Sequence, residues 1–358
     1  MTEKIKGLRQ ASRAMITVGL VVYNREWIIG KMLDSLLSQN YPHDNIYIVV
    51  VDGGSEDSTV EIIKDKLENS DFSSYEIIVE KCNIPEGRNI CIERARGDVL
   101  VFWDSDVIMG SDALSKLVEP ITEEKADIVF AEQISIYLNS SDELDKKIKT
   151  LVLNGKETKC VDTPSVGMGC TAVSKRVFES LHFDEDLTYS EDLYFSAMAR
   201  MINFKMVKNR GVRAYDINLM KRKYSDIFVD MPLKYHLRGL RKKAEAHVLT
   251  CDFNVTFEAF LKFFMRNKRY AFYLGYIPVA IVTVYSFLSG QLLVLLLPTY
   301  IVLYLALQVR KRGFLKAVKA FLRSIIVGIP FSILLVYYFI KHATANKSHR
   351  NGSFRELK

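Results

Sequence analysis

The chain has 358 residues, of which 49% are hydrophobic and 25% charged, a composition that fits one large or two modest globular domains. Its formal charge of +7 is unevenly spread, because residues 1–220 hold 26 basic and 36 acidic side chains, and the basic excess lies at 221–269 and 310–358. Basic segments beside apolar runs favour anionic lipid headgroups as partners and argue against a nucleic-acid-binding protein.

The first part of the chain predicts apolar strands that alternate with helices. Strands are expected at 16–23, 46–51, 76–80 and 99–103. Helices are expected at about 28–37, from about 58 onward, and at 87–95. Continuous apolar strands separated by helices are typical of a mostly parallel sheet covered on both faces, so the predicted fold class is α/β.

Polar clusters follow three of these strands and are expected to meet at one edge of the sheet, where ligands bind in such folds. The clusters are Tyr23-Asn24-Arg25-Glu26, Asp52-Gly53-Gly54-Ser55 and Asp104-Ser105-Asp106. One residue separates Asp104 from Asp106, so both carboxylates can face one Mg²⁺ or Mn²⁺ together with phosphate oxygens of a substrate. The alternative interpretation is a pair of solvated loop acids.

Three further residues suit a nucleotide. Asp52 can accept hydrogen bonds from a base edge or from ribose hydroxyls, or it can simply shape its turn. Arg88 and Asn89 are expected at the start of a helix, where phosphate is favoured. Alternatively, Arg88 pairs with a surface acid.

The pair Glu191-Asp192 precedes a helical pattern at 193–201. Acids at a helix start often only complement the helix dipole. The alternative is a general base, because an acceptor hydroxyl must lose a proton as it attacks.

In this order, the motifs resemble those of the family 2 glycosyltransferases, which have the GT-A fold. The resemblance covers about residues 16–217 and rests on Val22-Tyr23-Asn24-Arg25-Glu26, Val51-Asp52-Gly53-Gly54-Ser55, Asp57-Ser58-Thr59, Pro85-Glu86-Gly87-Arg88-Asn89, Gly97-Asp98, Asp104-Ser105-Asp106 and Glu191-Asp192. It implies an inverting, hexosyltransferase-type enzyme that uses a nucleotide sugar, with Asp192 as the base and Asp104 and Asp106 at the metal. The substrate-binding residues are then expected to be Tyr23, Glu26, Asp52, Arg88, Asn89, Asp104 and Glu191.

Other segments extend or depart from this resemblance. Residues 167–178, followed by 182–185, resemble the acceptor-side segment of the family. Gly53 stands where members often have a second Asp. Members often carry a His on the last strand, but residues 214–217 here read Ala-Tyr-Asp-Ile. The resemblance therefore assigns no third protein ligand to the metal.

The C-terminal third predicts a membrane region after a catalytic domain at 1–220. Residues 271–309 lack Asp, Glu, Lys and Arg, a 39-residue run that fits two spans. The expected segments are basic interface helices at 221–269, spans at about 271–289, 291–309 and 322–341 within 270–341, and a basic tail at 342–358. Basic residues flanking the first two spans place the catalytic domain in the cytoplasm of a multi-pass protein of the cell membrane.

The predicted function is transfer of a sugar from a nucleotide-diphosphate donor to a hydroxyl of a lipid-linked or membrane-proximal glycan. A polyprenyl phosphate acceptor is the second candidate, although it needs no base and Glu191-Asp192 favours a hydroxyl. A phosphatase with Asp104 as nucleophile also fits Asp104-Ser105-Asp106-Val107, but such enzymes usually carry the motif on an early strand. A catalytically silent membrane scaffold is the remaining alternative, and a homo-oligomer stays open.

Overall fold

A computed structural model describes residues 14–72, 74–151, 159–187, 189–219, 237, 239–250, 301–302, 310 and 314–352. They belong to two compact units that divide after Lys221.

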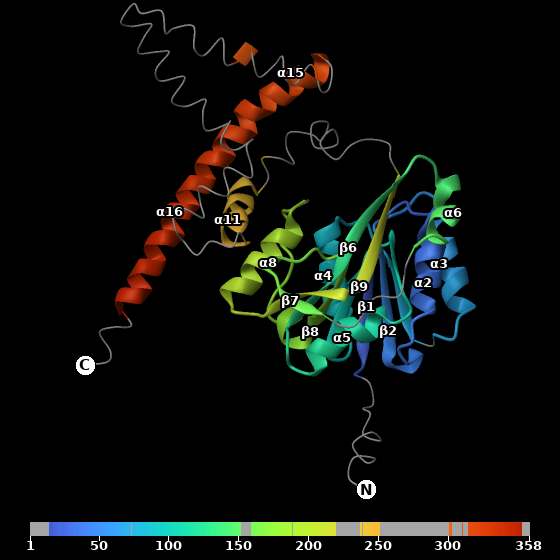
Figure 1. Ribbon diagram of the computed structural model, residues 1–358. Coiled ribbons are helices and arrows are strands. Elements are labelled where there is room, and N and C mark those ends of the chain that lie inside the picture. Colours follow the sequence, from blue (N-terminus) through green and yellow to red (C-terminus); the bar gives the residue numbers. More distant parts are fainter. Residues whose placement is uncertain are drawn as a thin grey trace, which may run out of the picture. The chain divides into compact units, whose positions relative to one another are not determined.

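The first unit is built on a mixed sheet, which has nine strands within the described residues (Figure 1). Four neighbouring strands are parallel: β3 (Tyr75–Val79), β2 (Ile46–Asp52), β1 (Ile16–Val22) and β4 (Val99–Trp103). Beyond β4 the directions are mixed. β8 (Cys170–Ser174) is antiparallel to β4 and to β6 (Ile128–Leu138), and β9 (Met206–Leu219) is parallel to β6. β5 (Val107–Met109) and β7 (Cys160–Asp162) are both antiparallel to β9. The order in which strands are added to the sheet reverses between β1 and β4, and open α/β sheets bind ligands at such a point.

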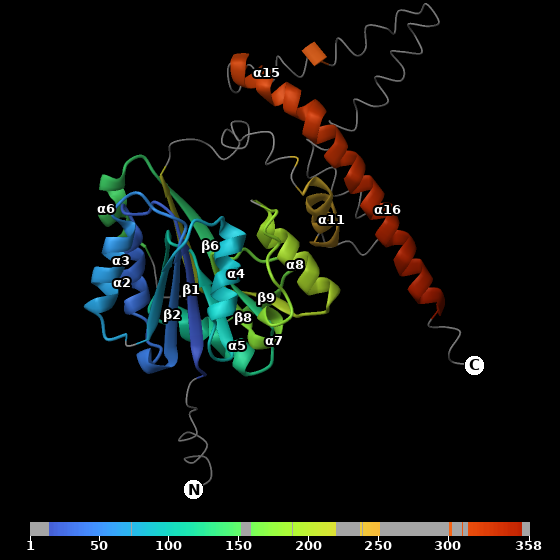
Figure 2. The ribbon, with the colours of Figure 1, turned by 180° about the vertical axis from the view of Figure 1, so that it is seen from behind.

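Helices cover both faces of this sheet (Figure 2). One core contains residues from α2 (Ile29–Leu37), α3 (Thr59–Glu68) and α5 (Ala113–Thr122). The other contains residues from α4 (Ile84–Arg94), α7 (Lys175–Phe178) and α8 (Glu191–Met201). Successive side chains of a strand point to opposite faces, so a strand buried on both sides must be apolar throughout. The α/β prediction is confirmed.

Shorter elements complete the unit. They are η1 (His43–Asn45), η2 (Ser141–Glu143) and α6 (Leu144–Ile148). An ion pair of 2.9 Å between Lys31 of α2 and Asp145 of α6 joins these two helices.

The predicted start of one helix is wrong. The sequence favoured a start at Gly87, but α4 begins at Ile84 because Asn83 and Glu86 form a capping box. The Asn83 side chain accepts from the Glu86 amide at 3.0 Å, and the Glu86 carboxylate accepts from the Asn83 amide at 2.6 Å. Arg88 and Asn89 therefore lie in the second turn, and the N-terminus of the helix does not explain their role.

The second unit is described at α11 (Leu240–Thr250), α15 (Phe314–Arg323), a π-helical turn (Ser324–Gly328) and α16 (Ile329–Gly352). Ala244 and Val248 of α11 pack with Phe331, Leu335 and Tyr338 of α16. By length and composition, the 22-residue stretch Ala317–Tyr338 can cross a membrane, where the sequence predicted an apolar helix at about 322–341. The span predicted at 271–289, the span predicted at 291–309 apart from residues 301–302, and most of the basic segment 221–269 lie outside the described residues.

Candidate active site

The polar clusters that follow β1, β2 and β4 do meet at one edge of the sheet. The amide of Asn24 donates to Ser55 Oγ at 2.8 Å, and the amide of Arg25 donates to Thr59 Oγ1 at 2.7 Å. Glu26 accepts from the Ser58 amide at 3.1 Å. Arg25 Nε lies 3.5 Å from Asp106 Oδ2 and so links the first cluster to the third.

Asp52 shapes its own turn. The residue is fully buried, and its Oδ1 accepts from the amides of Gly54 at 2.9 Å and Ser55 at 2.7 Å. Its Oδ2 accepts from Ser55 Oγ at 2.6 Å. Both carboxylate oxygens are engaged, so these contacts favour the turn-shaping interpretation. Tyr23, which follows β1, is 52% exposed and presents its ring to solvent at the same edge.

Arg88 joins two of the predicted site acids. Its Nη1 donates to Glu191 Oε1 at 2.8 Å, and its Nη2 lies 3.3 Å from Asp104 Oδ1. The alternative interpretation gave Arg88 a surface acid as partner; the side chain of Glu191 is 11% exposed and that of Asp104 is 38% exposed, while Arg88 itself is only 5% exposed. Burial acts to lower the pKa of Arg88, but Asp104 and Glu191 outweigh it and raise that pKa. The guanidinium is therefore a permanent positive charge between two acids.

Asn89, the next residue of α4, fastens a different segment. Its Nδ2 donates to the Phe183 carbonyl at 3.0 Å and to Glu185 Oε1 at 2.9 Å, and its Oδ1 accepts from the Phe183 amide at 2.8 Å. These bonds hold the segment predicted to face the acceptor. Asn89 acts there as a structural clamp.

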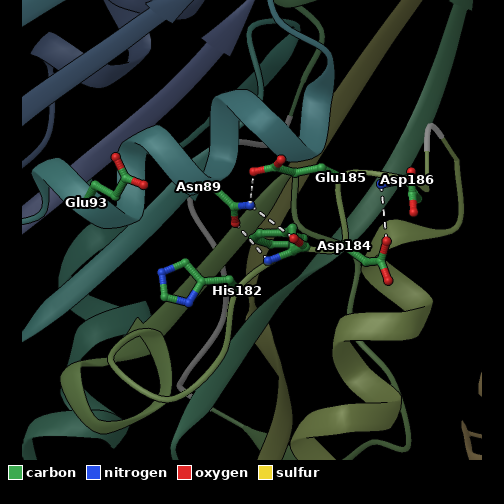
Figure 3. A pocket seen from close by; sticks show the side chains of 7 residues that line it. Asn89, Glu93, His182, Asp184, Glu185 and Asp186 are labelled. Carbon is green, nitrogen blue, oxygen red and sulfur yellow. Dashed lines mark hydrogen bonds between the residues drawn. The ribbon is translucent and has the colours of Figure 1, made fainter.

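The same segment and α4 line an open pocket of about 490 Å³ (Figure 3). Its polar lining is mostly acidic, with carboxylates from Glu93, Asp184, Glu185 and Asp186 and the ring of His182. Four carboxylates repel a phosphate group. The pocket therefore suits hydroxyl-bearing or cationic groups better than a diphosphate.

Asp104 is held from two sides. Arg88 pairs with its carboxylate, and its amide donates to the carbonyl of Gly169 at 2.8 Å. A Cβ on residue 169 would lie 2.6 Å from Asp104 Oδ2, which is closer than atoms can approach. Only glycine at this position leaves the Asp104 carboxylate where it is.

Asp106 lies deeper than Asp104. Its side chain is 19% exposed, against 38% for Asp104. Burial and the charge of Asp104 raise the pKa of Asp106 to about 7, although Arg25 opposes the shift. A further positive charge near the pair, in addition to Arg25 and Arg88, would stabilise both carboxylates in their ionised form.

The donor set fits a divalent cation that is bound together with a diphosphate. Within the described ranges, no three His, Cys, Asp or Glu side chains gather closely enough to hold a metal ion alone. Mg²⁺ is commonly bound through one or two carboxylates, with substrate phosphates and water completing its shell. Asp104 and Asp106 supply that number of carboxylates.

Asp216 is an acid near the site to which the sequence gave no role. It pairs with Val107 across the β5–β9 register, and the amide of Ile217 donates to the Asp106 carbonyl at 2.9 Å. Its carboxylate accepts from Gln133 at 3.2 Å, Ser135 at 3.2 Å and Asn218 at 2.8 Å. Burial and the charge of Asp104 act to raise its pKa. The sequence showed that His is missing here but not that this Asp approaches the paired acids.

Glu191 and Asp192 open α8, after Ser190 in the left-handed region with φ of 63°. Glu191 turns to Arg88, whereas Asp192 Oδ1 accepts from the amide of Leu193 at 2.7 Å. Burial and the charge of Glu191 raise the pKa of Asp192 to about 6. At neutral pH this carboxylate is mostly ionised, yet it is basic enough to take up a proton.

A model of glycosyl transferase family 2 matches residues 17–181, which run from β1 past α7. Residues 17–181 form a family 2 glycosyltransferase domain. The family 2 domain therefore contains Asp52, Arg88 and the paired acids, whereas Glu191-Asp192 and Asp216 follow it.

Two curated proteins show where the similarity lies. A poly(ribitol-phosphate) beta-glucosyltransferase of Bacillus spizizenii is 34% identical over 120 residues, which are 32% of this chain and 18% of that protein. A dolichyl N-acetyl-alpha-D-glucosaminyl phosphate 3-beta-D-2,3-diacetamido-2,3-dideoxy-beta-D-glucuronosyltransferase of Methanococcus voltae is 27% identical over 210 residues, 55% of this chain and 65% of that protein. The chain thus matches less than two thirds of the length of each relative.

A comparison with solved structures bears on the fold. A mannosyltransferase of Pyrobaculum calidifontis, solved with GDP-Man and Mn²⁺, superimposes with a TM-score of 0.50 at 18% identity. The match covers 97% of this chain and 92% of that one. The mixed α/β sheet described above is the GT-A fold, as the sequence predicted.

Proposed function

We propose that this chain is an inverting, metal-dependent glycosyltransferase. In this proposal it moves a sugar from a nucleotide-diphosphate donor to a hydroxyl of a lipid-linked or membrane-proximal glycan. The observation that carries the proposal is the pair of contacts made by the buried guanidinium of Arg88. It joins Asp104, on the donor side, to Glu191, which precedes Asp192. Arg88 thus links one acid assigned to the leaving group with the residue beside the proposed base.

The proposed reaction is a single displacement. The acceptor oxygen forms a bond to the anomeric carbon as the bond from that carbon to the diphosphate oxygen breaks, and the hydroxyl proton passes to Asp192. Attack opposite the leaving group inverts the anomeric centre. General base catalysis of this kind contributes about 10²- to 10⁴-fold. A pKa of about 6 for Asp192 matches that role near neutral pH.

The donor side is assigned to the paired acids. Asp104 and Asp106 would hold Mg²⁺ or Mn²⁺, which when bound supplies positive charge to the departing diphosphate. Tyr23 and Glu26 border the same edge of the sheet, and Asp52 keeps the neighbouring turn in shape. We assign Asp52 to the nucleotide site through this turn rather than through a direct bond, because both of its carboxylate oxygens are engaged.

An acceptor hydroxyl is favoured over a polyprenyl phosphate. The acceptor side carries Glu191, Asp192 and the four-carboxylate pocket, which would repel a phosphate as the attacking group. This repulsion concerns the attacking group alone and leaves room for a phosphate elsewhere in the acceptor. The names of the Bacillus and Methanococcus relatives, a poly(ribitol-phosphate) and a dolichyl-phosphate-linked sugar acceptor, support a phosphate-linked polyol or glycan as the substrate class. A phosphatase loses support because the acid pair follows the fourth strand of a family 2 domain.

We further propose that the enzyme works at a membrane. The organisation that we favour is a cytoplasmic catalytic domain at 1–220, basic interface helices at 221–269, spans within 270–341 and a basic tail at 342–358. The apolar stretch Ala317–Tyr338 supports the last span, and the net positive charge of the C-terminal third supports contact with anionic headgroups.

Binding and turnover test the proposal separately. The purified chain should bind UDP or GDP in a Mn²⁺-dependent manner, measured by titration calorimetry, and a nucleotide sugar should compete. Substituting both Asp104→Asn and Asp106→Asn should abolish the metal dependence. Transfer is then assayed with a panel of nucleotide sugars and membrane lipid extracts. Metal-dependent affinity that survives the double substitution would refute the assignment of the donor site.

A further inference from the structure

Arg25 projects from a rigid part of the chain. Its amide donates to Thr59 Oγ1 at 2.7 Å, and its carbonyl accepts from the amides of Ile28 at 3.0 Å and Ile29 at 2.9 Å. Asn24 beside it has a positive φ of 50°. The backbone of Arg25 is thus fixed between two loops, and only its side chain has freedom to move.

The guanidinium of Arg25 is incompletely bonded. Nη1 donates to the carbonyls of Tyr23 at 3.3 Å and Asn24 at 3.2 Å. Nε is buried, lies 3.5 Å from Asp106 Oδ2 and makes no hydrogen bond to any described residue. A buried donor without a partner is costly, so this arrangement favours a better acceptor when one arrives.

The surroundings of Arg25 suit a diphosphate. Its side chain is 38% exposed and lies beside Asp106, one of the two acids assigned to the metal. An arginine fork binds phosphate oxygens through two parallel hydrogen bonds, which are stronger than a single long contact to a carboxylate. Arg25 also places a positive charge where a cation would bind, so the two compete for Asp106.

We propose that Arg25 leaves Asp106 and binds the diphosphate of the donor when the donor and its cation enter the site. This inference rests on the proposed function, because it takes the donor to be a nucleoside diphosphate sugar. Arg25 then has opposite effects on two ligands. It weakens binding of the cation alone and strengthens binding of the nucleotide.

The substitution Arg25→Gln tests both effects in the full chain. Mn²⁺ affinity without nucleotide, measured from the electron paramagnetic resonance signal of free Mn²⁺, should rise about twofold to fivefold, as for loss of one partly exposed charge pair. Affinity for UDP or GDP at saturating Mn²⁺, measured by calorimetry, should fall about tenfold to a hundredfold, as for loss of a charge-assisted hydrogen bond. Arg25→Lys keeps the charge and should recover Mn²⁺ binding to the wild-type level but only part of the nucleotide affinity.

Arg94→Gln is the matched control. Arg94 also pairs with one acid at 3.5 Å, Glu76, and its side chain is 55% exposed. Removing this charge should change neither affinity, and thermal melting followed by circular dichroism should show that both variants fold.

The outcomes separate this inference from the proposed function. Suppose that the wild type binds Mn²⁺ and nucleotide, but Arg25→Gln changes both affinities in the same direction or changes neither of them. The inference on Arg25 is then wrong, while the proposed function stands. If the wild type binds neither UDP nor GDP, the proposed function fails.

Discussion

Two arginines reach the paired acids, and they are held in different ways. Arg88 is 5% exposed and bonds to Glu191 at 2.8 Å while it pairs with Asp104. The side chain of Arg25 is 38% exposed and lies 3.5 Å from Asp106 without a hydrogen bond to it among the described residues. The buried, hydrogen-bonded guanidinium of Arg88 is held in place, whereas the partly exposed guanidinium of Arg25 can exchange partners. The α4 side of the site is therefore expected to be rigid and the β1 side adaptable.

The largest expected effect on turnover is at Asp192, next to the rigid side. Asp192→Asn should lower the transfer rate by about 10²- to 10⁴-fold, because the amide cannot take up the acceptor proton. Mn²⁺-dependent nucleotide affinity should stay at the wild-type value. A variant that keeps its transfer rate would remove Asp192 from the mechanism and favour the polyprenyl phosphate acceptor.

The largest expected effect on folding is at Arg88. Arg88→Met leaves Glu191 buried without its cation, so the free energy of unfolding should fall by about 3 kcal/mol. Arg25→Gln, by contrast, should cost less than about 1 kcal/mol, because its pair is partly exposed. Denaturant titration of both variants measures the difference. Equal losses in the free energy of unfolding would contradict the expectation that the Arg88 side of the site is more rigid than the Arg25 side.

A substitution at Gly169 tests whether the position of the Asp104 carboxylate depends on the absence of a side chain at residue 169. Gly169→Ala places a methyl group 2.6 Å from Asp104 Oδ2 and should cost about 1 to 3 kcal/mol of stability through overpacking. Mn²⁺-dependent nucleotide binding should weaken with it. Gly167→Ala is the control, since its Cβ would meet its nearest neighbour, Gln133, at 3.5 Å. Similar losses of stability and nucleotide affinity in the two variants would show that Gly169 has no specific role at Asp104.

The pH dependence of kcat should give the smallest effect. The pKa of Asp192 is raised to about 6, and only its ionised form accepts a proton. The rate should therefore be nearly full at pH 7 and fall about tenfold for each unit below pH 6. Saturating donor and metal keep the titration of Asp106, with its pKa of about 7, out of the measurement. A flat profile from pH 5 to 7 would exclude this base.

Local patterns predicted the sheet well and the site in part. Runs such as Ile46–Val51 and Val99–Trp103 are apolar throughout and rich in β-branched and aromatic residues, so the parallel strands were placed within two residues. The start of α4 was missed because Pro85 and Gly87 look like loop residues, although Asn83 and Glu86 carry the capping signal.

Long-range partners could not be predicted in the same way. Arg88 contacts Asp104 and Glu191 only because α4 and α8 pack in the folded chain. Glu191 is 103 residues further along the sequence, so no local pattern relates it to Arg88. Asp216 approaches the paired acids because β5 and β9 pair in one register, which no local pattern encodes. The sequence placed Arg25 in a polar cluster at the ligand edge of the sheet, but it did not predict that this side chain lies beside Asp106.

The adjacent residues Arg88 and Asn89 have a consequence for engineering. Arg88 pairs with Asp104 and Glu191, and Asn89 bonds to residues 183 and 185. In the proposed reaction, neighbouring positions of α4 therefore support both the donor and the acceptor. A chimera that imports residues 182–187 from a relative should therefore keep a residue at 185 that can accept from Asn89. Without it, the exchanged loop would lose its hydrogen bond to the helix whose Arg88 also pairs with Asp104 and Glu191.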